Sequence, residues 1–191
     1  MGDGRVGAVI LAAGASRRYG SPKQLVVVDG RTLLEHAIAA AQSAELVPIV
    51  AVVPVWLSRP DTLDDELRWI RNPFPERGLS LSLRLAFEAL GAEVEAALIL
   101  LGDQPRVEPA TIAAVLAARG PQPLIAVSAG GVLAPPVLIE RSHFSLVEDL
   151  SGDVGLRQVL AANPELVRVV EVDTHPPDVD TPDDLGRILG P

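Results

Sequence analysis

The sequence predicts one α/β domain with a mostly parallel sheet and helices on both faces. Three runs, Val6–Leu11, Val47–Val53 and Ala96–Leu101, are almost wholly apolar, as expected of strands that are covered on both sides. Helical patterns lie between them, and the order strand, helix, strand implies right-handed crossovers and parallel pairing. A chain of 191 residues can bury one sizeable core, so we expect a single domain over residues 1–191.

The composition excludes several classes of protein. Hydrophobic residues make up 48% and charged residues 21% of the chain, which is typical of a globular protein. The net charge of −9 argues against nucleic acid as a partner, because a nucleic-acid-binding face normally shows a basic patch. No cysteine is present, which excludes disulfides and thiolate chemistry. The N-terminus lacks a signal-peptide pattern and no apolar run is long enough to cross a bilayer, so we expect a cytoplasmic protein without membrane contact.

The first half of the chain divides into elements as follows. Thr32 and Glu35 form a capping box, which predicts a helix from Leu33 to about Ser43. The second strand, 47–53, comes next. Weak periodicity and several prolines then predict a short helix near 61–66 and an edge strand near 68–72.

The second half continues the alternation of helices and strands. The run at 96–101 is the most uniformly apolar and is expected at the centre of the sheet. Thr181 as cap and Pro182 at the first helical position predict the start of the last helix. The other expected elements are helices at 78–91, 110–118, 139–150 and 155–162 and strands at 124–127 and 167–172.

The stretch from Leu11 to Leu25 has the composition of a phosphate-binding loop. Small residues follow the first strand directly, and three cations, Arg17, Arg18 and Lys23, come within seven positions. Small residues let backbone N–H groups approach an oxyanion, and the cations add charge. Lys23 is the only lysine among 16 basic residues. A lone ammonium in this loop indicates a point charge placed against a phosphate.

Spacing excludes the common alternatives for this loop and for other chemistry. Five residues separate Gly14 from Gly20, and Ser21 follows, so neither a Walker loop nor a G-x-G-x-x-G fingerprint is present. No G-x-S-x-G elbow occurs, which argues against a serine hydrolase. The three histidines are scattered without ligand spacing, which argues against a zinc site: His36, His143 and His175.

Two aspartates are candidate metal ligands. Asp103 directly follows the central apolar strand, and ligands of open α/β sheets bind beyond the carboxyl ends of strands. On local grounds alone, a role in a turn or as a cap of the next helix would be the favoured explanation of Asp103. Asp180 stands one residue ahead of the Thr181 cap, so capping does not explain it. Mg²⁺ prefers one or two carboxylates together with phosphate oxygens, and these two residues could hold Mg²⁺ or Mn²⁺.

The loop resembles a known family. Residues 11–25 match the signature L-A-A/G-G-x-S-x-R-x-G-x-x-K of the MobA-like nucleotidyltransferases, and the L-A-A-G and P-K-Q-L spellings are most similar to the molybdenum cofactor cytidylyltransferase branch. Other family patterns recur along the chain: G-L-S-x-S-L at 78–83, G-D-Q-P at 102–105, P-V-L at 136–138, G-D-x-G-x-R at 152–157 and D-x-D-T-P-x-D-L at 178–185.

The resemblance implies a three-layer α/β/α Rossmann-like nucleotidyltransferase fold that transfers CMP from CTP to a phosphorylated acceptor, molybdopterin, with a divalent metal. The residues expected at the nucleotide are Leu11, Ala12, Ala13, Gly14, Arg18, Lys23 and Asn72. Those expected at the acceptor are Gly78, Ser80, Ser82, Pro136 and Asp153. The expected catalytic residues are Arg18, Lys23 and Asp103, and the expected metal ligands are Asp103 and Asp180.

Some positions depart from the family pattern, and the alternatives stay open. Ala134 and Pro135 stand where polar residues are usual, and Leu156 replaces a smaller residue. The same loop serves relatives that use GTP, or that use sugar phosphates, phospholactate or methylerythritol phosphate as acceptors. A non-catalytic chaperone that delivers a cofactor to a molybdoenzyme is the alternative of another class, although binding alone would not require two metal-ligating carboxylates.

Overall fold

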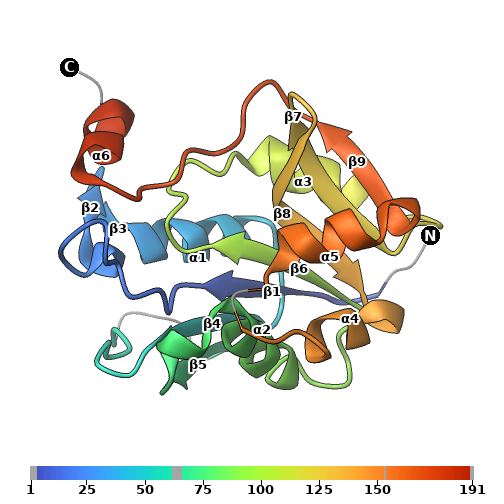
Figure 1. The fold of residues 1–191 in the computed structure, drawn as a ribbon, viewed down its shortest axis with the longest axis horizontal. Helices are drawn as coiled ribbons and strands as arrows, with labels where there is room; N and C mark the ends of the chain where they lie inside the picture. Colours follow the sequence, from blue (N-terminus) through green and yellow to red (C-terminus); the bar gives the residue numbers. More distant parts are fainter. Residues whose placement is uncertain (1–3, 62–65, 153, 190–191) are drawn as a thin grey trace.

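A seven-stranded sheet forms the centre of the computed structural model, which describes residues 4–61, 66–152 and 154–189 (Figure 1). The strands run in the order β5-β4-β1-β6-β8-β7-β9. Only the two pairs that involve β8 are antiparallel. The strands are β1 (Val6–Leu11), β4 (Ile49–Pro54), β5 (Leu67–Asn72), β6 (Ala96–Leu101), β7 (Leu124–Ala129), β8 (Val132–Glu140) and β9 (Val167–Glu171). The predicted mostly parallel sheet, with 96–101 at its centre, is confirmed.

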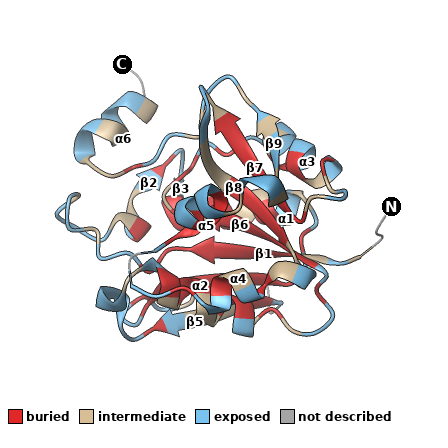
Figure 2. Ribbon diagram, turned by 45° about the vertical axis from the view of Figure 1, so that its right-hand side comes forward, coloured by how far each residue is buried: buried red, intermediate tan, exposed pale blue. Residues whose placement is uncertain are grey.

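Helices cover both faces of this sheet, so the predicted three-layer arrangement is also confirmed. On one face lie α1 (Leu33–Ser43) and α3 (Pro109–Ala117). On the other lie α2 (Leu79–Glu88), α4 (Ser145–Glu148) and α5 (Leu156–Ala162). The buried residues therefore follow β1, β6 and their neighbours between the two helical layers (Figure 2).

The point where the strand order reverses lies between β1 and β6. The chain passes from β1 to β4 on one side of β1 and returns through α2 to β6 on the other. Leu11 is level with both Val52 on β4 and Leu101 on β6, so β1 and β6 end together, and β4 continues beyond them to Pro54. Such a reversal leaves a crevice at the carboxyl ends of the strands, where open α/β sheets bind ligands.

A smaller unit lies beside this crevice. The hairpin of β2 (Val27–Val28) and β3 (Arg31–Thr32) shares an apolar cluster with α6 (Pro182–Leu189), which brings the end of the chain back to the first loop. The capping box predicted before α1 is present, with Glu35 N donating to Thr32 Oγ1 at 3.2 Å and Thr32 N donating to Glu35 Oε2 at 2.7 Å. Short 3-10 turns complete the fold at Lys23–Leu25 (η1), Pro75–Arg77 (η2), Arg141–His143 (η3) and Pro164–Leu166 (η4).

The structure corrects the predicted helix at 139–150. Strand β8 continues to Glu140, a 3-10 turn follows, and only Ser145–Glu148 is α-helical. The reason is that Val137, Leu138 and Ile139 are fully buried and pair with β6 on one side and β7 on the other, which a helix could not do. The short helix expected near 61–66 falls mainly on residues 62–65, outside the described residues. No helix in the described ranges combines the length and apolar character needed to cross a membrane.

Candidate active site

The loop after β1 leaves the sheet through small, buried residues. Ala12 and Ala13 are buried, and a side chain at Gly14 would meet open space. Ser16 has a left-handed backbone, φ 52°, and its carbonyl accepts hydrogen bonds from the N–H groups of Tyr19 and Gly20, both at 3.1 Å. The loop thus turns outward at Ser16 and returns to the sheet at η1, which carries Lys23.

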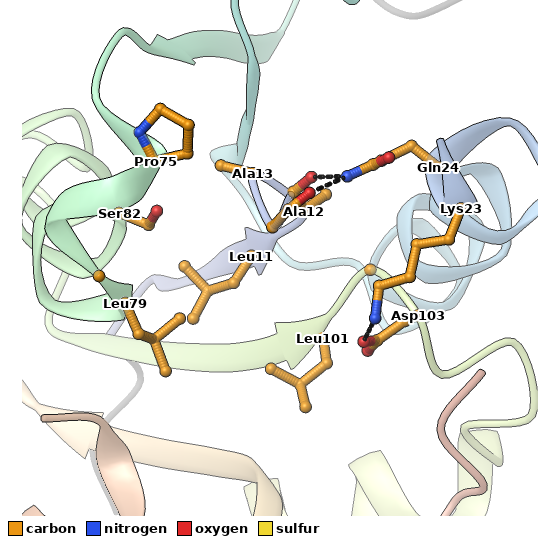
Figure 3. Close-up of a pocket in the computed structure, with 13 residues that line it drawn as sticks. Leu11, Ala12, Ala13, Lys23, Gln24, Pro75, Leu79, Ser82, Leu101 and Asp103 are labelled. Atoms are coloured by element: carbon orange, nitrogen blue, oxygen red, sulfur yellow. Dashed lines mark hydrogen bonds and ion pairs between the residues drawn. The ribbon is translucent and has the colours of Figure 1, made fainter. Parts of the chain in front are cut away.

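Four of the expected site residues meet in one place. The Lys23 ammonium lies 2.5 Å from Asp103 Oδ2 and 3.1 Å from Asp180 Oδ1, so it bridges one carboxylate from the middle of the chain and one from near its C-terminus. The other oxygen of Asp180 lies 2.9 Å from Arg18, whose side chain is 76% exposed. Figure 3 shows Lys23 reaching from its turn to Asp103 at the end of β6.

Lys23 is protonated at neutral pH. Burial lowers the pKa of its ammonium, but the charges and hydrogen bonds of Asp103 and Asp180 outweigh burial and leave the pKa above its usual value. The side chains of Lys23 and Asp103 are only 15% and 20% exposed, so solvent screens this pair weakly. The site therefore holds a permanent positive charge between two acids.

Asp103 and Asp180 are also the residues that could hold a divalent cation. Asp103 Oδ1 is buried and has no hydrogen-bond partner among the described residues, so one oxygen remains available to a further ligand. No group of three or more histidine, aspartate or glutamate side chains within residues 4–61, 66–152 and 154–189 is arranged to hold a metal. The donor set is therefore a carboxylate pair, and this suits Mg²⁺ or Mn²⁺ only when phosphate oxygens complete the coordination.

Backbone and side-chain contacts with the end of β6 hold Asp180 in place. Val179 N donates to the carbonyl oxygen of Asp103 at 3.0 Å, and the buried Gln104 donates from Nε2 to Asp178 Oδ1 at 2.8 Å. The carboxyl of Asp178 has a raised pKa, chiefly because it is partly buried and also because Asp103 and Asp180 repel its charge, although the Gln104 hydrogen bond opposes the shift. The sequence analysis assigned no role to Gln104 or Asp178, although both stand in family patterns, G-D-Q-P at 102–105 and D-x-D-T-P-x-D-L at 178–185.

A cavity of about 350 Å³ opens beside these residues. It is lined by the first loop, the start of α2 and the end of β6, including Leu11, Ala12, Ala13, Gly14, Lys23, Gln24, Gly78, Leu79, Ser82 and Asp103. Gly78 and Ser82 thus line the same cavity as the loop, so residues expected at the acceptor and at the nucleotide share one space.

A second cavity, of about 520 Å³, adjoins the first at Ala13, Gly14, Gln24 and Pro75. Its wall includes Trp56, whose side chain is half-exposed just beyond the end of β4. The sequence analysis missed Trp56, although an aromatic residue directly after a strand that ends at the crevice is a detectable signal.

The other residues expected at the nucleotide or the acceptor do not all line the two cavities. Asn72 is buried and lines the second cavity, and its amide is engaged with Ser82 Oγ at 2.9 Å and with the N–H of Phe74 at 2.9 Å. Ser80 is buried, and its hydroxyl has no partner among the described residues. Pro136 is buried in β8, at an irregularity of its pairing with β7. Asp153 lies outside the described residues.

A phosphate-loop cleft at a strand-order reversal, with a bridging lysine and two acids, defines a nucleotide-binding α/β domain. Residues 8–169 match the model of the MobA-like NTP transferase domain. The chain belongs to this family of nucleotidyltransferases, as the resemblance of its loop implied.

Individual proteins are similar over much of the chain. The bifunctional protein GlmU of Bordetella parapertussis is 33% identical over 154 residues, which are 76% of this chain but only 32% of GlmU. The chain therefore spans about a third of that relative's length. The purine catabolism protein PucB of Bacillus subtilis is 28% identical and aligns over 94% of both chains. The crystal structure of Rv0371c from Mycobacterium tuberculosis superposes with a TM-score of 0.86 at 28% identity, covering 97% of this chain and 98% of Rv0371c. Another structure of Rv0371c is a complex with manganese, with a TM-score of 0.79 at 25% identity and the same coverage.

Proposed function

We propose that this chain transfers CMP from CTP to the phosphate of molybdopterin and releases pyrophosphate. The observation that carries the proposal is the convergence of Lys23, Asp103 and Asp180 on one point at the end of β1 and β6. In the reaction, an acceptor phosphate oxygen bonds to the α-phosphorus of CTP while the bond to the β-phosphate oxygen breaks, and pyrophosphate leaves with the electron pair. The attacking oxygen is already anionic, so no general base is needed and the task of the protein is alignment and charge neutralisation.

Each charged residue has a role in this scheme. Arg18 and the backbone from Gly14 to Gly20 hold the β- and γ-phosphates, and Lys23 lies beside the α-phosphate. Arg18 is exposed and paired with Asp180, so a triphosphate can recruit it by competing for its guanidinium. Mg²⁺ or Mn²⁺, held by Asp103 and Asp180, supplies further neutralisation of phosphate charge when bound.

The proposal of CTP and of molybdopterin as substrates rests on the amino-acid sequence of the loop. Ala13 gives the L-A-A-G form that accompanies CTP in the resemblance, and we expect the base to lie near Ala13 with Asn72 close to its edge. Ser80, Pro136 and Asp153 remain proposed acceptor contacts. For Gly78 and Ser82, the cavity shared with the loop supports contact with either substrate.

Pyrophosphate release tests the proposal. The chain is assayed with CTP, GTP, ATP and UTP, each with molybdopterin, a sugar phosphate, phospholactate and methylerythritol phosphate. We expect release with CTP and molybdopterin, and a loss of at least about a hundredfold in Asp103→Asn, because that change removes a charge from the transition-state environment. Asp149→Asn, at an exposed position after α4, is the matched control and should keep full activity.

The other outcomes identify the alternatives. Release only with GTP, or only with another acceptor, would keep the reaction type and replace the substrate. Binding of a triphosphate without pyrophosphate release from any pair would favour the chaperone that serves a molybdoenzyme. A thermal-shift screen of the four triphosphates with Mg²⁺ or Mn²⁺ checks the base separately, since a ligand stabilises the folded state according to its affinity.

A further inference from the structure

The side chain next to Lys23 joins three residues of the phosphate loop. Gln24 is only 3% exposed. Its Nε2 donates to the carbonyl oxygen of Ala12 at 2.7 Å and to that of Gly14 at 2.9 Å, and its Oε1 accepts from the Ser16 hydroxyl at 3.3 Å. One carboxamide therefore fixes every second residue across the segment where the chain leaves β1.

The same network extends to Lys23. The Ser16 hydroxyl, which donates to Gln24, accepts a hydrogen bond from the backbone N–H of Lys23 at 3.2 Å. The two neighbouring side chains point in different directions: Gln24 toward the loop and Lys23 toward Asp103 (Figure 3). The shape of the loop and the position of the ammonium are thus set by one connected group of contacts.

The orientation of the two carbonyl groups matters for an anion. A carbonyl oxygen carries partial negative charge and repels a phosphate that it faces, whereas the N–H groups of a small-residue loop attract it. The oxygens of Ala12 and Gly14 point at Gln24 Nε2, so neither is directed at a phosphate in the cavity that these residues line.

Few other side chains could make these contacts. Two donations from one nitrogen, with an acceptor beside it, require a carboxamide. Asparagine is one methylene shorter, ionised glutamate has no donor, and methionine offers neither group. A buried carbonyl that loses its partner is destabilised, so the loop would rearrange to find water or another donor.

We propose that Gln24 is a positioning residue for the triphosphate: it shapes the loop so that the β- and γ-phosphates meet N–H groups instead of carbonyl oxygens. The proposal rests on the proposed function, because it assumes that this loop receives a nucleoside triphosphate. Gln24 itself touches no phosphate, and its effect is transmitted through Ala12, Gly14 and Ser16.

The test compares two ligands that differ only beyond the α-phosphate. Affinities for CTP and CMP are measured by calorimetry with Mn²⁺ for the wild type and Gln24→Met. We expect CTP affinity to fall about tenfold or more, while CMP affinity changes less than about threefold, so that the preference for the triphosphate shrinks. Gln42→Met, the same change at an exposed glutamine of α1, should leave both affinities unaltered.

Each result decides the matter. Equal losses for CTP and CMP would indicate a general structural role for Gln24 and overturn the proposal, as would an unchanged CTP affinity. If Gln24→Met does not fold, Gln24→Asn, which keeps an uncharged carboxamide but is one methylene shorter, provides the comparison without adding a charge to the loop. A wild type that binds none of CTP, GTP, ATP and UTP would instead defeat the proposed function, and the role of Gln24 with it.

Discussion

Replacing Lys23 by methionine should destabilise the metal-free protein and improve its metal binding. Methionine keeps most of the length but removes the charge that Asp103 and Asp180 share. Breaking a fully buried ion pair costs about 3–5 kcal/mol of unfolding free energy. The three side chains here are 15%, 20% and 31% exposed, so solvent relieves part of this and we expect about 2–3 kcal/mol. For a chain of this length, that corresponds to a fall in Tm of about 4–12 °C.

Lys23→Met should lower the stability of the metal-free protein but increase the stabilisation that a divalent metal gives. In the wild type, a cation must compete with the ammonium for both carboxylates, whereas in Lys23→Met only the exposed Arg18 still competes, and only for Asp180. Millimolar Mn²⁺ should therefore raise the Tm of the variant more than that of the wild type. Thermal unfolding in EDTA and in Mn²⁺ measures both effects. Arg106→Met is the control, because the Arg106–Asp29 pair is 44% and 56% exposed and is worth less than about 1 kcal/mol.

The pH dependence gives an independent check. A lysine whose pKa is raised on folding contributes stability that is complete below its unfolded pKa, 10.5, and is lost as the pH rises through the folded value. The Tm gap between wild type and Lys23→Met should therefore be constant from about pH 7 to 9 and narrow only at strongly alkaline pH. A variant as stable as the wild type in EDTA, or stabilised by Mn²⁺ no more than the wild type, would refute the bridging role.

Three further changes test other parts of the site. Trp56→Ala should weaken CTP binding about 5–30-fold, because it removes a stacking surface worth about 1–2 kcal/mol, and it should change the Tm little. An unchanged CTP affinity in a titration would show that the base lies elsewhere. Gly102→Ala would place a Cβ 2.7 Å from that of Ala12, so the ends of β6 and β1 must separate. We expect the free energy of unfolding, measured in denaturant, to fall by about 1–3 kcal/mol and pyrophosphate release to become slower. A variant equal to the wild type in both measurements would contradict this packing. Asp184→Asn should lower the Tm at pH 7, because the hydroxyl and N–H of Thr181 lower the pKa of Asp184 and stabilise its carboxylate. This stabilisation is present above the unfolded pKa of 3.8 and is lost as the pH falls through the lower folded value, so the Tm gap should narrow in that acid range. A gap that stays unchanged as the pH falls well below 3.8 would point to another cause.

Local patterns were sufficient for most of the fold. Continuous apolar runs identified β1, β4 and β6, and the capping box identified the start of α1. These signals are reliable because each depends on residues that are close in sequence. The predicted helix at 139–150 wrongly included residues 139 and 140, which end β8. The apolar run at 137–139 is too short to distinguish strand from helix, and only its pairing with two neighbouring strands decides that it is extended.

The main charged residues of the site could also be predicted, although for different reasons. Asp103 ends a central strand, and topology alone directs such a residue toward the crevice. Asp180 has no such signal, since its place depends on the hydrogen bond from Val179 N to the carbonyl of Asp103. Besides the family motif, only the lack of a capping role for Asp180 pointed to it.

The buried glutamines show a more general limit. Gln24 donates to two backbone carbonyls, and Gln104 donates to one backbone carbonyl and to the carboxylate of Asp178. Every residue type carries a carbonyl, so a backbone partner leaves no trace in the sequence. A polar residue beside a lysine, as in Lys23-Gln24, is equally compatible with an exposed turn. Each buried carbonyl of the loop needs a hydrogen-bond donor, and the need for a buried glutamine is therefore visible only in the folded structure. Both glutamines stand in family patterns, P-K-Q-L and G-D-Q-P, but those patterns give neither their burial nor their partners. The contacts by which a residue positions a phosphate loop through its backbone are therefore what a sequence pattern is least able to reveal.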